Sequence, residues 1–359
     1  MSRDNKHSPV LALLRRVFSS RSSFSSWFFI SLLICLPALP LCAANLATVA
    51  LTSHSSQEEI QRALDGMREG GEVVLGPGTY EVHQPIVLKY DHQTLRGSGL
   101  TTVLHLANNA NCPVIILGSP MTLPQGTTAH LRLADLVIDG NRLNQQAELW
   151  RTATDGSLLN NNGIDVWDVN DSTVESVVCR SCRSGGLVTA TTRRLNVRNF
   201  TAYDNQFDGL ACYLTEDCHF SGLRLHDNLG AGISLDLAFN HNVIDDAVLT
   251  GNDQGVFMRY SRGNSFKRLT ISKSHNNGIF MAQTAAPTLN GWTLRPGTEC
   301  TGNNFEGLKI TNCAGDAFLV NDSSCKDNMI GDARFQDNRN SDLTLAGDKL
   351  VSVGAFSRH

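Results

Sequence analysis

The sequence carries little charge and no strong imbalance between acids and bases. Charged residues account for 18% of its 359 positions, the formal net charge is −4, and the basic residues are scattered along the chain. Nucleic-acid-binding proteins instead gather lysine and arginine into a basic patch or stripe. We therefore expect no nucleic-acid partner.

The sequence also lacks the motif pattern of a zinc or redox protein. Cys179 and Cys182 form a Cys-x-x-Cys pair, but no second pair follows at the spacing of a zinc site. After the first 44 residues the chain keeps an even number of cysteines, which permits disulfides in an exported protein. These cysteines are Cys112, Cys179, Cys182, Cys212, Cys218, Cys300, Cys313 and Cys325. The sequence does not settle whether a metal is bound.

The N-terminal segment has the pattern of a signal peptide. Residues 1–26 are basic and rich in serine, residues 27–41 form a short apolar run, and small alanines follow. The run is too short, and too interrupted by proline, for a membrane span. We expect a signal peptide over residues 1–44, a single domain over residues 45–359, and a secreted or periplasmic protein with no membrane attachment after cleavage.

A strict repeat occupies the centre of the chain. Six glycines recur at intervals of 23 residues, each followed by a short, strand-like segment. They are Gly163, Gly186, Gly209, Gly232, Gly255 and Gly278. A fixed period of this length indicates a solenoid, in which each unit buries its apolar face only against its neighbours.

Each repeat is built from strands. The first and third residues after each glycine are mostly apolar and the second and fourth are mixed, which is the alternation of a half-buried strand. Asn-x-apolar turns precede a second strand at Asn242, Asn264, Asn303 and Asn328, and asparagine tolerates the conformations of repeated corners. The ladder of a leucine-rich repeat is absent. Before the repeats, a capping box at Ser56–Glu59 predicts a helix that covers the exposed end of the coil.

The 23-residue units, together with an N-terminal segment over residues 60–64 and 70–80, resemble the pectin-lyase-like right-handed parallel β-helix superfamily. The resemblance extends over nearly the whole chain after residue 44. It implies an all-β fold, a single-stranded right-handed parallel β-helix with an N-terminal capping helix. It also implies that the face formed by the glycine-led strands carries the substrate groove.

Stacking the repeats brings equal positions into columns with neighbours about 4.8 Å apart. The outward column at the fourth position contains Trp167, Ala190, Tyr213, Asp236, Arg259 and Ala282. The outward column at the second position contains Asp165, Val188, Ala211, Ser234, Phe257 and Phe280. A polymer along these columns would meet aromatic rings, small residues and a charged centre, which suits a polysaccharide.

The charged centre can serve proton transfer on a uronate. Such chemistry needs a cation beside the carboxylate and a base near C5. We expect Arg259, Asp236 and Tyr213 to be catalytic. Arg259 would bind the carboxylate, or act as the base as the resemblance to pectate lyases implies. Tyr213 would donate or accept a proton, and Asp236 would orient Arg259 or hold Ca²⁺. We expect Trp167, Asp165 and Ser234 to bind substrate. The alternative is an ordinary exposed ion pair worth under ~1 kcal/mol.

Known catalytic motifs match only in part. Asp165 and Asp168 have the spacing of the acids in the D-P-H-D motif of alginate C5-epimerases, but Val166 and Trp167 replace its proline and histidine. The G-H-G and R-I-K motifs of polygalacturonase-type hydrolases are missing, which argues against that class. If Asp316 is aligned with the repeat glycines, Phe318 continues an outward aromatic column.

Two insertions, residues 141–161 and 284–302, break the period, and insertions in repeat proteins usually gather on the binding face. Trp292 and Arg295 of the second insertion are therefore further candidates for substrate binding. We interpret the chain as an exported, monomeric, carbohydrate-active protein that acts on a polyuronate by β-elimination or C5-epimerisation. The alternative is a non-catalytic protein of the same fold that binds polysaccharide or belongs to a surface.

Overall fold

The computed structural model describes eight stretches of the chain. They are residues 46–119, 126–146, 161–281, 288–289, 292–293, 299–345, 351–353 and 356–358. The segment expected to be a signal peptide lies outside them, as does Arg295. All the described residues belong to one compact unit, Leu46–His359. Among them, no helix is long and apolar enough to cross a membrane.

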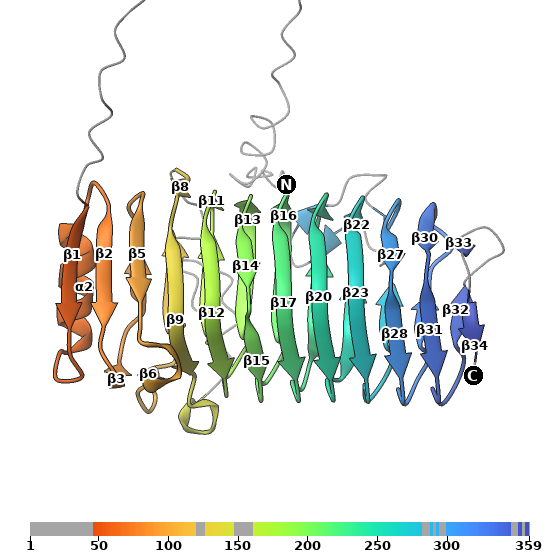
Figure 1. Ribbon diagram of the computed structural model, residues 1–359, viewed down its shortest axis with the longest axis horizontal. Coiled ribbons are helices and arrows are strands. Elements are labelled where there is room, and N and C mark those ends of the chain that lie inside the picture. Colours follow the sequence, from red (N-terminus) through yellow and green to blue (C-terminus); the bar gives the residue numbers. More distant parts are fainter. Residues whose placement is uncertain are drawn as a thin grey trace, which may run out of the picture. The chain divides into compact units, whose positions relative to one another are not determined.

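Parallel strands dominate the unit and stack in chain order along its length (Figure 1). The first sheet, called sheet A, has as its main strands β1 (Ala47–Leu51), β2 (Gly71–Leu75), β5 (Gln93–Arg96), β9 (Arg132–Asp139), β12 (Thr173–Arg180), β17 (His219–His226), β20 (Val243–Thr250), β23 (Ser265–Ser272), β28 (Leu308–Thr311), β31 (Ala333–Gln336) and β34 (Phe356–Arg358). Shorter strands of sheet A are β3 (Gly78–Val82), β6 (Thr102–Leu106), β14 (Asn196–Arg198), β15 (Thr201–Tyr203), β27 (Asn304–Glu306), β30 (Asn328–Ile330) and β33 (Val351–Val353).

The glycine-led strands form a second parallel sheet, called sheet B. Its path runs through β4 (Ile86–Leu88), β7 (Ile115–Gly118), β10 (Ile164–Trp167), β13 (Leu187–Arg193), β16 (Leu210–Glu216), β18 (Ala231–Asp236), β21 (Gln254–Met258), β24 (Ile279–Met281), β29 (Phe318–Val320) and β32 (Leu343–Leu345). At its margin lie β8 (Thr128–Ala129), β11 (Val169–Asn170), β19 (Phe239–Asn240) and β22 (Ser261–Arg262). A separate antiparallel hairpin joins β25 (Thr288–Leu289) to β26 (Trp292–Thr293).

The register of sheet B confirms the 23-residue period. Ile164 pairs with Leu187, which pairs with Leu210, and the same offset continues to Ile279. The first residue after each glycine and the third are buried in the interior, as the alternation predicts. The described part of the chain is therefore the expected all-β parallel β-helix.

The capping helix is also present. Helix α2 spans Gln57–Gly66, and two short 3₁₀ turns follow later in the chain, η1 (Gly99–Thr101) and η2 (Arg142–Asn144). The Ser56 hydroxyl accepts a hydrogen bond from the Glu59 amide at 3.3 Å, and the Glu59 carboxylate accepts one from the Ser56 amide at 2.9 Å. Ile60 and Leu64 are fully buried, so the helix covers the apolar end of the coil.

The repeating glycines are required because consecutive rungs approach closely at their backbones. A Cβ atom added to Gly186 would lie 2.6 Å from the carbonyl oxygen of Gly209, and one added to Gly255 would lie 2.3 Å from that of Gly278. Real Cβ atoms do not come that close to backbone atoms. The glycine column therefore fixes the spacing and register of sheet B.

Buried asparagine side chains form hydrogen-bonded ladders at two corners of the coil. The first ladder contains Asn205, Asn228 and Asn252, with amide-to-amide bonds of 2.8 Å. The second contains Asn242, Asn264, Asn303 and Asn328, with bonds of 3.3, 2.9 and 2.8 Å. The second ladder confirms the predicted asparagine corners; the first was not predicted. Both ladders satisfy polar groups that would be costly to bury alone.

Three cysteines occupy corners of the same kind, two of them at the ends of these ladders. The backbone amides of Cys182, Cys218 and Cys313 each donate to an asparagine oxygen of the next rung, at 2.8 to 3.1 Å. Each thiol donates to the carbonyl oxygen two residues earlier in the chain. None of the eight cysteines in the described residues forms a disulfide, and all eight are buried. These three are therefore small corner residues with a weak donor.

One aromatic prediction is wrong. Phe318 pairs with Ile279 and is fully buried, while Leu319 pairs with Phe280 on the outer face. The residue that follows Gly278 in its column is Ala317, not Asp316, because the Gly278 Cβ position faces the Ala317 carbonyl at 2.5 Å. The insertion in this rung changes the alignment by one residue, and a one-residue change exchanges the two faces of a strand.

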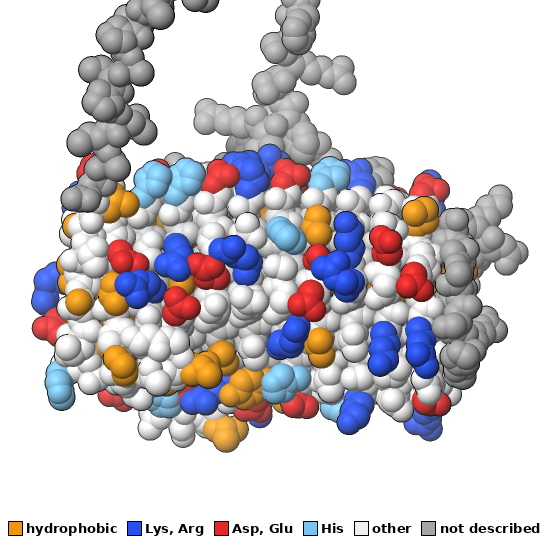
Figure 2. Space-filling model, in the orientation of Figure 1, with side chains coloured by type: hydrophobic (Ala, Val, Ile, Leu, Met, Phe, Trp, Pro, Cys, Tyr) orange, Lys and Arg blue, Asp and Glu red, His pale blue; other side chains and the backbone are white. Residues whose placement is uncertain are grey.

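On the face of the unit seen in Figure 2, acidic and basic side chains are interspersed. Several of them pair across rungs of sheet A, for example Arg132 with Glu175 at 2.7 Å and Arg268 with Asp245 at 2.6 Å. Exposed pairs of this kind each add little stability. They do keep this face from presenting one sign of charge.

We predict that Gly255→Ala destabilises the protein by about 1–3 kcal/mol, the usual cost of overpacking a close contact, because the new methyl would collide with the Gly278 carbonyl. Gly66→Ala is the matched control, since no atom lies within 4 Å of its added Cβ. Urea denaturation followed by circular dichroism measures both. Equal midpoints for the two variants would contradict the role of the glycine column.

Candidate functional site

The outer face of sheet B brings the three predicted catalytic residues together. Tyr213 of β16 pairs in register with Asp236 of β18. Arg259 follows Met258, whose partner is Leu235, so it occupies the same column one rung further on. The Arg259 Nε donates to Asp236 Oδ2 at 2.9 Å, and its Nη2 donates to the same oxygen. The predicted ladder thus exists as a contiguous group of side chains.

The pair of Arg259 and Asp236 is buried, not exposed. Their side chains keep only 18% and 6% of their surface accessible. Asp236 Oδ1 also accepts a hydrogen bond from the Leu237 amide at 2.8 Å, and the guanidinium lies 5.3 Å from the centre of the Phe257 ring. Burial raises the pKa of Asp236, and the hydrogen bonds from Arg259 oppose that shift. Removing one partner of such a pair typically costs about 3–5 kcal/mol.

A carboxyl group that the sequence analysis missed lies next to this pair. Asp208 precedes Gly209 at the corner before β16, and its Oδ1 accepts the Ala231 amide at 2.7 Å. Burial raises the pKa of Asp208 to about 7; the carboxylates of Asp253 and Asp236 raise it further, while hydrogen bonds from Ala231 and Ser234 lower it. Ser234, predicted to bind substrate, therefore contacts this carboxyl.

Asp208 could have been found from its column. The residues immediately before the six repeat glycines are Asn162, Gly185, Asp208, Ala231, Gln254 and Asn277. Several of them accept the backbone amide of the next rung, as Asn162 does from Gly185 at 2.8 Å. The signal in the sequence was that Asp208 is the one ionisable acid in this column, among small residues and side-chain amides. Asp208 precedes its glycine and therefore lies outside the outward columns that follow the glycines.

Tyr213 of the same sheet is partly buried, and the charges of both acids act on it. Burial raises the pKa of its phenol, and the nearby Asp208 and Asp236 raise it further. The hydroxyl therefore stays protonated through the physiological range. Together, Tyr213, Asp208, Asp236 and Arg259 form what is called here the acid cluster.

Two rungs before Tyr213, β10 places polar atoms without partners on the same face. Asp165 is 6% exposed; its Oδ1 accepts a hydrogen bond from Asn162 at 2.7 Å, and its Oδ2 is buried without a partner. Burial raises the pKa of Asp165 to about 7. The Trp167 indole Nε1 is likewise buried without a partner. Buried polar atoms are seldom left unsatisfied, so these two are exceptions that single out this rung of the face.

The second predicted insertion is described only in part. Trp292 lies in β26, where its partner in register is Leu289, and its side chain is outside the description. Arg295 lies outside the described residues altogether. Their expected role in binding is therefore untested. Among the described residues, no group of three or more His, Cys, Asp or Glu side chains is placed to hold a metal ion.

A sequence-family comparison assigns the chain to a family. The family model described as "Periplasmic copper-binding protein (NosD)" matches residues 134–349, which is more than half of the chain. The chain belongs to the NosD family. No curated protein matches the sequence.

Comparison with solved structures identifies the fold of this NosD-family chain. It is similar to an endo-xylogalacturonan hydrolase from Aspergillus tubingensis, with 13% identity, a TM-score of 0.58, and coverage of 86% of this chain and 92% of that one. It is also similar to the polygalacturonase of Erwinia carotovora ssp. carotovora, with 12% identity, a TM-score of 0.53, and coverage of 86% and 96%. A third is ORF18 of Geobacillus virus E2, with 13% identity, a TM-score of 0.56, and coverage of 86% of this chain but only 60% of the viral one. The fold is thus that of the pectin-lyase-like right-handed parallel β-helix proteins.

The raised pKa of Asp165 predicts a pH dependence of stability. Its folded value is about 7, against an ordinary value of 3.8, so the folded state holds the proton more tightly than the unfolded chain does. The resulting stabilisation is complete below about pH 4 and is lost as the pH rises towards 7. Asp165→Asn cannot ionise, so it should gain stability relative to wild type over this range, by up to about 4 kcal/mol.

Urea unfolding at a series of pH values measures this gain. Asp171→Asn is the control of opposite sign, because the Arg194 side chain lowers the pKa of Asp171. That carboxylate stabilises the fold above its ordinary pKa, so its variant should lose stability relative to wild type as the pH rises. A flat difference between Asp165→Asn and wild type would show that Asp165 titrates normally.

Proposed function

We propose that this chain is an exported protein that binds a polyuronate along the outer face of sheet B and moves the C5 proton of one uronate unit at the acid cluster. The observation that carries the proposal is the Asp208 carboxyl, whose pKa is raised to about 7 and whose charge acts on the protonated Tyr213, as the charges of Asp236 and Arg259 do. A general base is most effective when its pKa lies near the working pH. Groups with opposed titration in one site usually divide the roles of acid and base.

The geometry supports a division of labour among these residues. Asp208, ionised in about half of the molecules at neutral pH, takes the proton from C5. Tyr213, which stays protonated, donates a proton, and Arg259, fixed by Asp236, faces the carboxylate and the charge that develops beside C5. Arg259 is unsuited to act as the base, because its guanidinium donates two hydrogen bonds to Asp236.

The two candidate reactions share their first step. The base removes the C5 proton, and the electron pair is delocalised onto the uronate carboxyl group. In β-elimination, that pair forms the C4–C5 double bond, the C4–O bond breaks, and the leaving oxygen takes a proton from Tyr213. In epimerisation, a proton returns to C5 from the opposite face and no bond of the polymer breaks. The acid cluster supplies an acid and a base for either outcome.

The substrate class has a further support, since two proteins of the same fold are named for galacturonan hydrolysis. The second candidate function is polysaccharide binding without catalysis. It is favoured by the partly exposed Trp167 ring on the same face, which can contact a sugar but carries out no reaction.

The family description names copper, but the described residues show no thiol, imidazole and carboxylate cluster for it. Cys300 and Cys325 form a hydrogen-bonded thiol pair on adjacent rungs, and both are fully buried. Thiols bind metals as thiolates; burial raises the pKa of Cys300 well above its ordinary value, while the hydrogen bond from Cys300 lowers the pKa of Cys325. Within the described stretches, no group of three or more His, Cys, Asp or Glu side chains is placed to hold a metal ion, either at this pair or at Asp236. The proposed reaction therefore includes no metal step.

Ultraviolet absorbance of unsaturated uronate ends, measured with pectate and alginate, tests elimination; proton exchange at C5 in deuterated water tests epimerisation. We expect Asp208→Asn and Tyr213→Phe to lower the active reaction by about 10²–10⁴-fold, the usual contribution of a general acid or base. Asp316→Asn is the matched control, because Asp316 accepts the Ser341 amide at 2.8 Å in the same kind of corner.

Full activity in Asp208→Asn would refute the assigned base. If wild type binds the polymers but shows neither absorbance nor exchange, the non-catalytic function replaces the catalytic one. If it does not bind them, polyuronates are not its ligands.

A further inference from the structure

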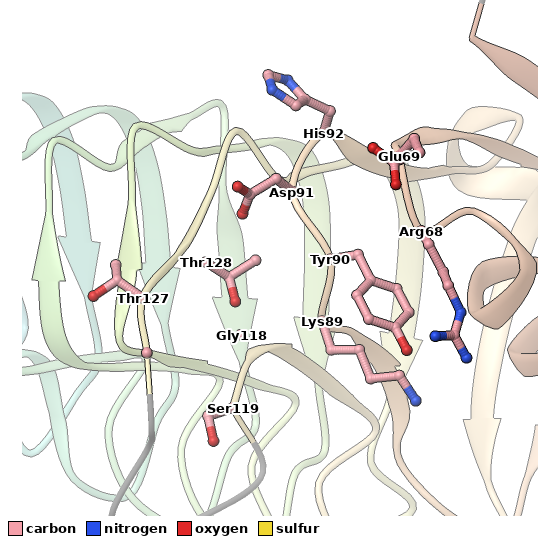
Figure 3. A pocket seen from close by; sticks show the side chains of 11 residues that line it. Arg68, Glu69, Lys89, Tyr90, Asp91, His92, Gly118, Ser119, Thr127 and Thr128 are labelled. Atoms are coloured by element: carbon pink, nitrogen blue, oxygen red, sulfur yellow. The ribbon is translucent and has the colours of Figure 1, made fainter.

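A cavity of about 600 Å³ opens near the N-terminal end of sheet B. Its walls come from the turn after α2, the segment after β4, and the segments that follow β7 and precede β8 (Figure 3). In Figure 3, the Tyr90 ring lies between the side chains of Arg68 and Lys89, while Ser119 and Thr128 face the opening from the other side. No repeat motif predicted this cavity, because the rungs that form it do not follow the 23-residue period.

This cavity lies on the same outward column as the acid cluster. Gly118 pairs with Trp167, Trp167 with Ala190, and Ala190 with Tyr213. Lys89 follows Leu88, whose partner is Leu117, so it begins this column. Each step between rungs is about 4.8 Å, which puts the cavity on the order of 20 Å from Tyr213 along the sheet. The unpartnered atoms of Asp165 and Trp167 lie between the two places.

The walls carry two cations, Arg68 and Lys89, and two carboxylates, Glu69 and Asp91, so what matters is which of them is already paired. The Arg68 guanidinium carbon lies 5.6 Å from the Tyr90 ring centre, and the Lys89 ammonium lies 5.5 Å from it. Lys89 is paired with Asp65 at 2.8 Å, whereas Arg68 forms no ion pair in the described part of the chain. The Asp91 carboxylate on the rim is occupied by the Ala129 amide at 2.8 Å.

Arg68 is therefore the cation of this cavity with its hydrogen-bond donors available, and a guanidinium binds carboxylates in a bidentate manner. The Tyr90 ring lies between Arg68 and Lys89, so its edge and hydroxyl are the parts available to a sugar. The hydroxyls of Thr127 and Thr128 add hydrogen-bonding groups at the rim. A neutral sugar would leave the arginine unmatched.

We propose that this cavity is a distal subsite for one uronate unit, with its carboxylate on Arg68 and its ring against the edge of Tyr90. The unit belongs to the same polymer whose other units cross Trp167 and reach the acid cluster. This inference rests on the proposed function for its ligand class, but it assigns binding and not chemistry to the cavity. It predicts that affinity depends on chain length, because only an oligomer on the order of 20 Å long reaches from Lys89 to Tyr213.

Isothermal titration of the full chain with galacturonate and mannuronate oligomers of increasing length tests the subsite, with cello-oligosaccharides as neutral probes. We expect affinity for the acidic series to rise sharply at the length that spans both places. Arg68→Ala should weaken binding of the long oligomers by about tenfold or more, as loss of a charged hydrogen bond does, and should flatten the length dependence. Tyr90→Ala should do the same, and Arg68→Lys should restore part of the loss.

Arg334→Ala, an exposed arginine of β31 at the other end of the coil, is the matched control and should bind as wild type does. Unfolding midpoints of all variants separate lost binding from lost folding. Where turnover is measurable, Arg68→Ala should raise KM and leave kcat unchanged.

The outcomes separate this inference from the proposed function. Length-dependent binding that needs Arg68, without turnover, supports the subsite and refutes the chemistry. Turnover with no effect of Arg68→Ala on KM or on length dependence overturns the subsite and leaves the chemistry standing. Equal binding of neutral and acidic oligomers also overturns the subsite.

Discussion

The contact on which the rest of the structure depends is the approach of one glycine to the carbonyl oxygen of the next rung. At Gly186, Gly209 and Gly255 the space for a side chain is taken by the backbone of the following repeat. A coil with larger residues there would separate its rungs and lose the hydrogen bonds of sheet B. Because this contact recurs every 23 residues, it also fixes which side chains share a column. The site is a consequence of that register.

Because equal positions of successive repeats stack in columns, the residues at a few positions of each repeat determine an extended surface. On the outer face of sheet B, the same positions carry unpartnered polar atoms at Asp165 and Trp167, small side chains at Ala190 and Ala211, and the acid cluster further on. The face is also dry enough to move the pKa values of two carboxyls to about 7. A linear ligand suits a linear arrangement, and a titrating acid suits proton transfer. These two properties together are the basis of the proposed function.

The sequence predicted what depends on the strict period. The strands of the repeats, their register and the grouping of Tyr213, Asp236 and Arg259 follow from equal spacing, and the second asparagine ladder follows from its Asn-x-apolar turns. It did not predict Asp208, because an acid at a corner has the same turn-forming chemistry as the asparagines around it. It misplaced Phe318, because an insertion of variable length precedes it and strand faces alternate at every residue. The N-terminal cavity was missed because its rungs are irregular. Burial of the ion pair between Arg259 and Asp236 was also missed, because it depends on neighbouring residues outside their column.

The asparagine ladders give the coil a property of a one-dimensional lattice. Each amide in the interior of a ladder bonds to the amide of the next rung and accepts from the one before, so neighbouring rungs are coupled and distant ones are not. A defect at a terminal rung can only fray the end. A defect at Asn228 or Asn264 instead weakens the coupling inside the coil, where only the strands of sheets A and B still join the rungs on its two sides. Because the acid cluster draws on rungs on both sides of Asn228, such a weak point would fall within the site.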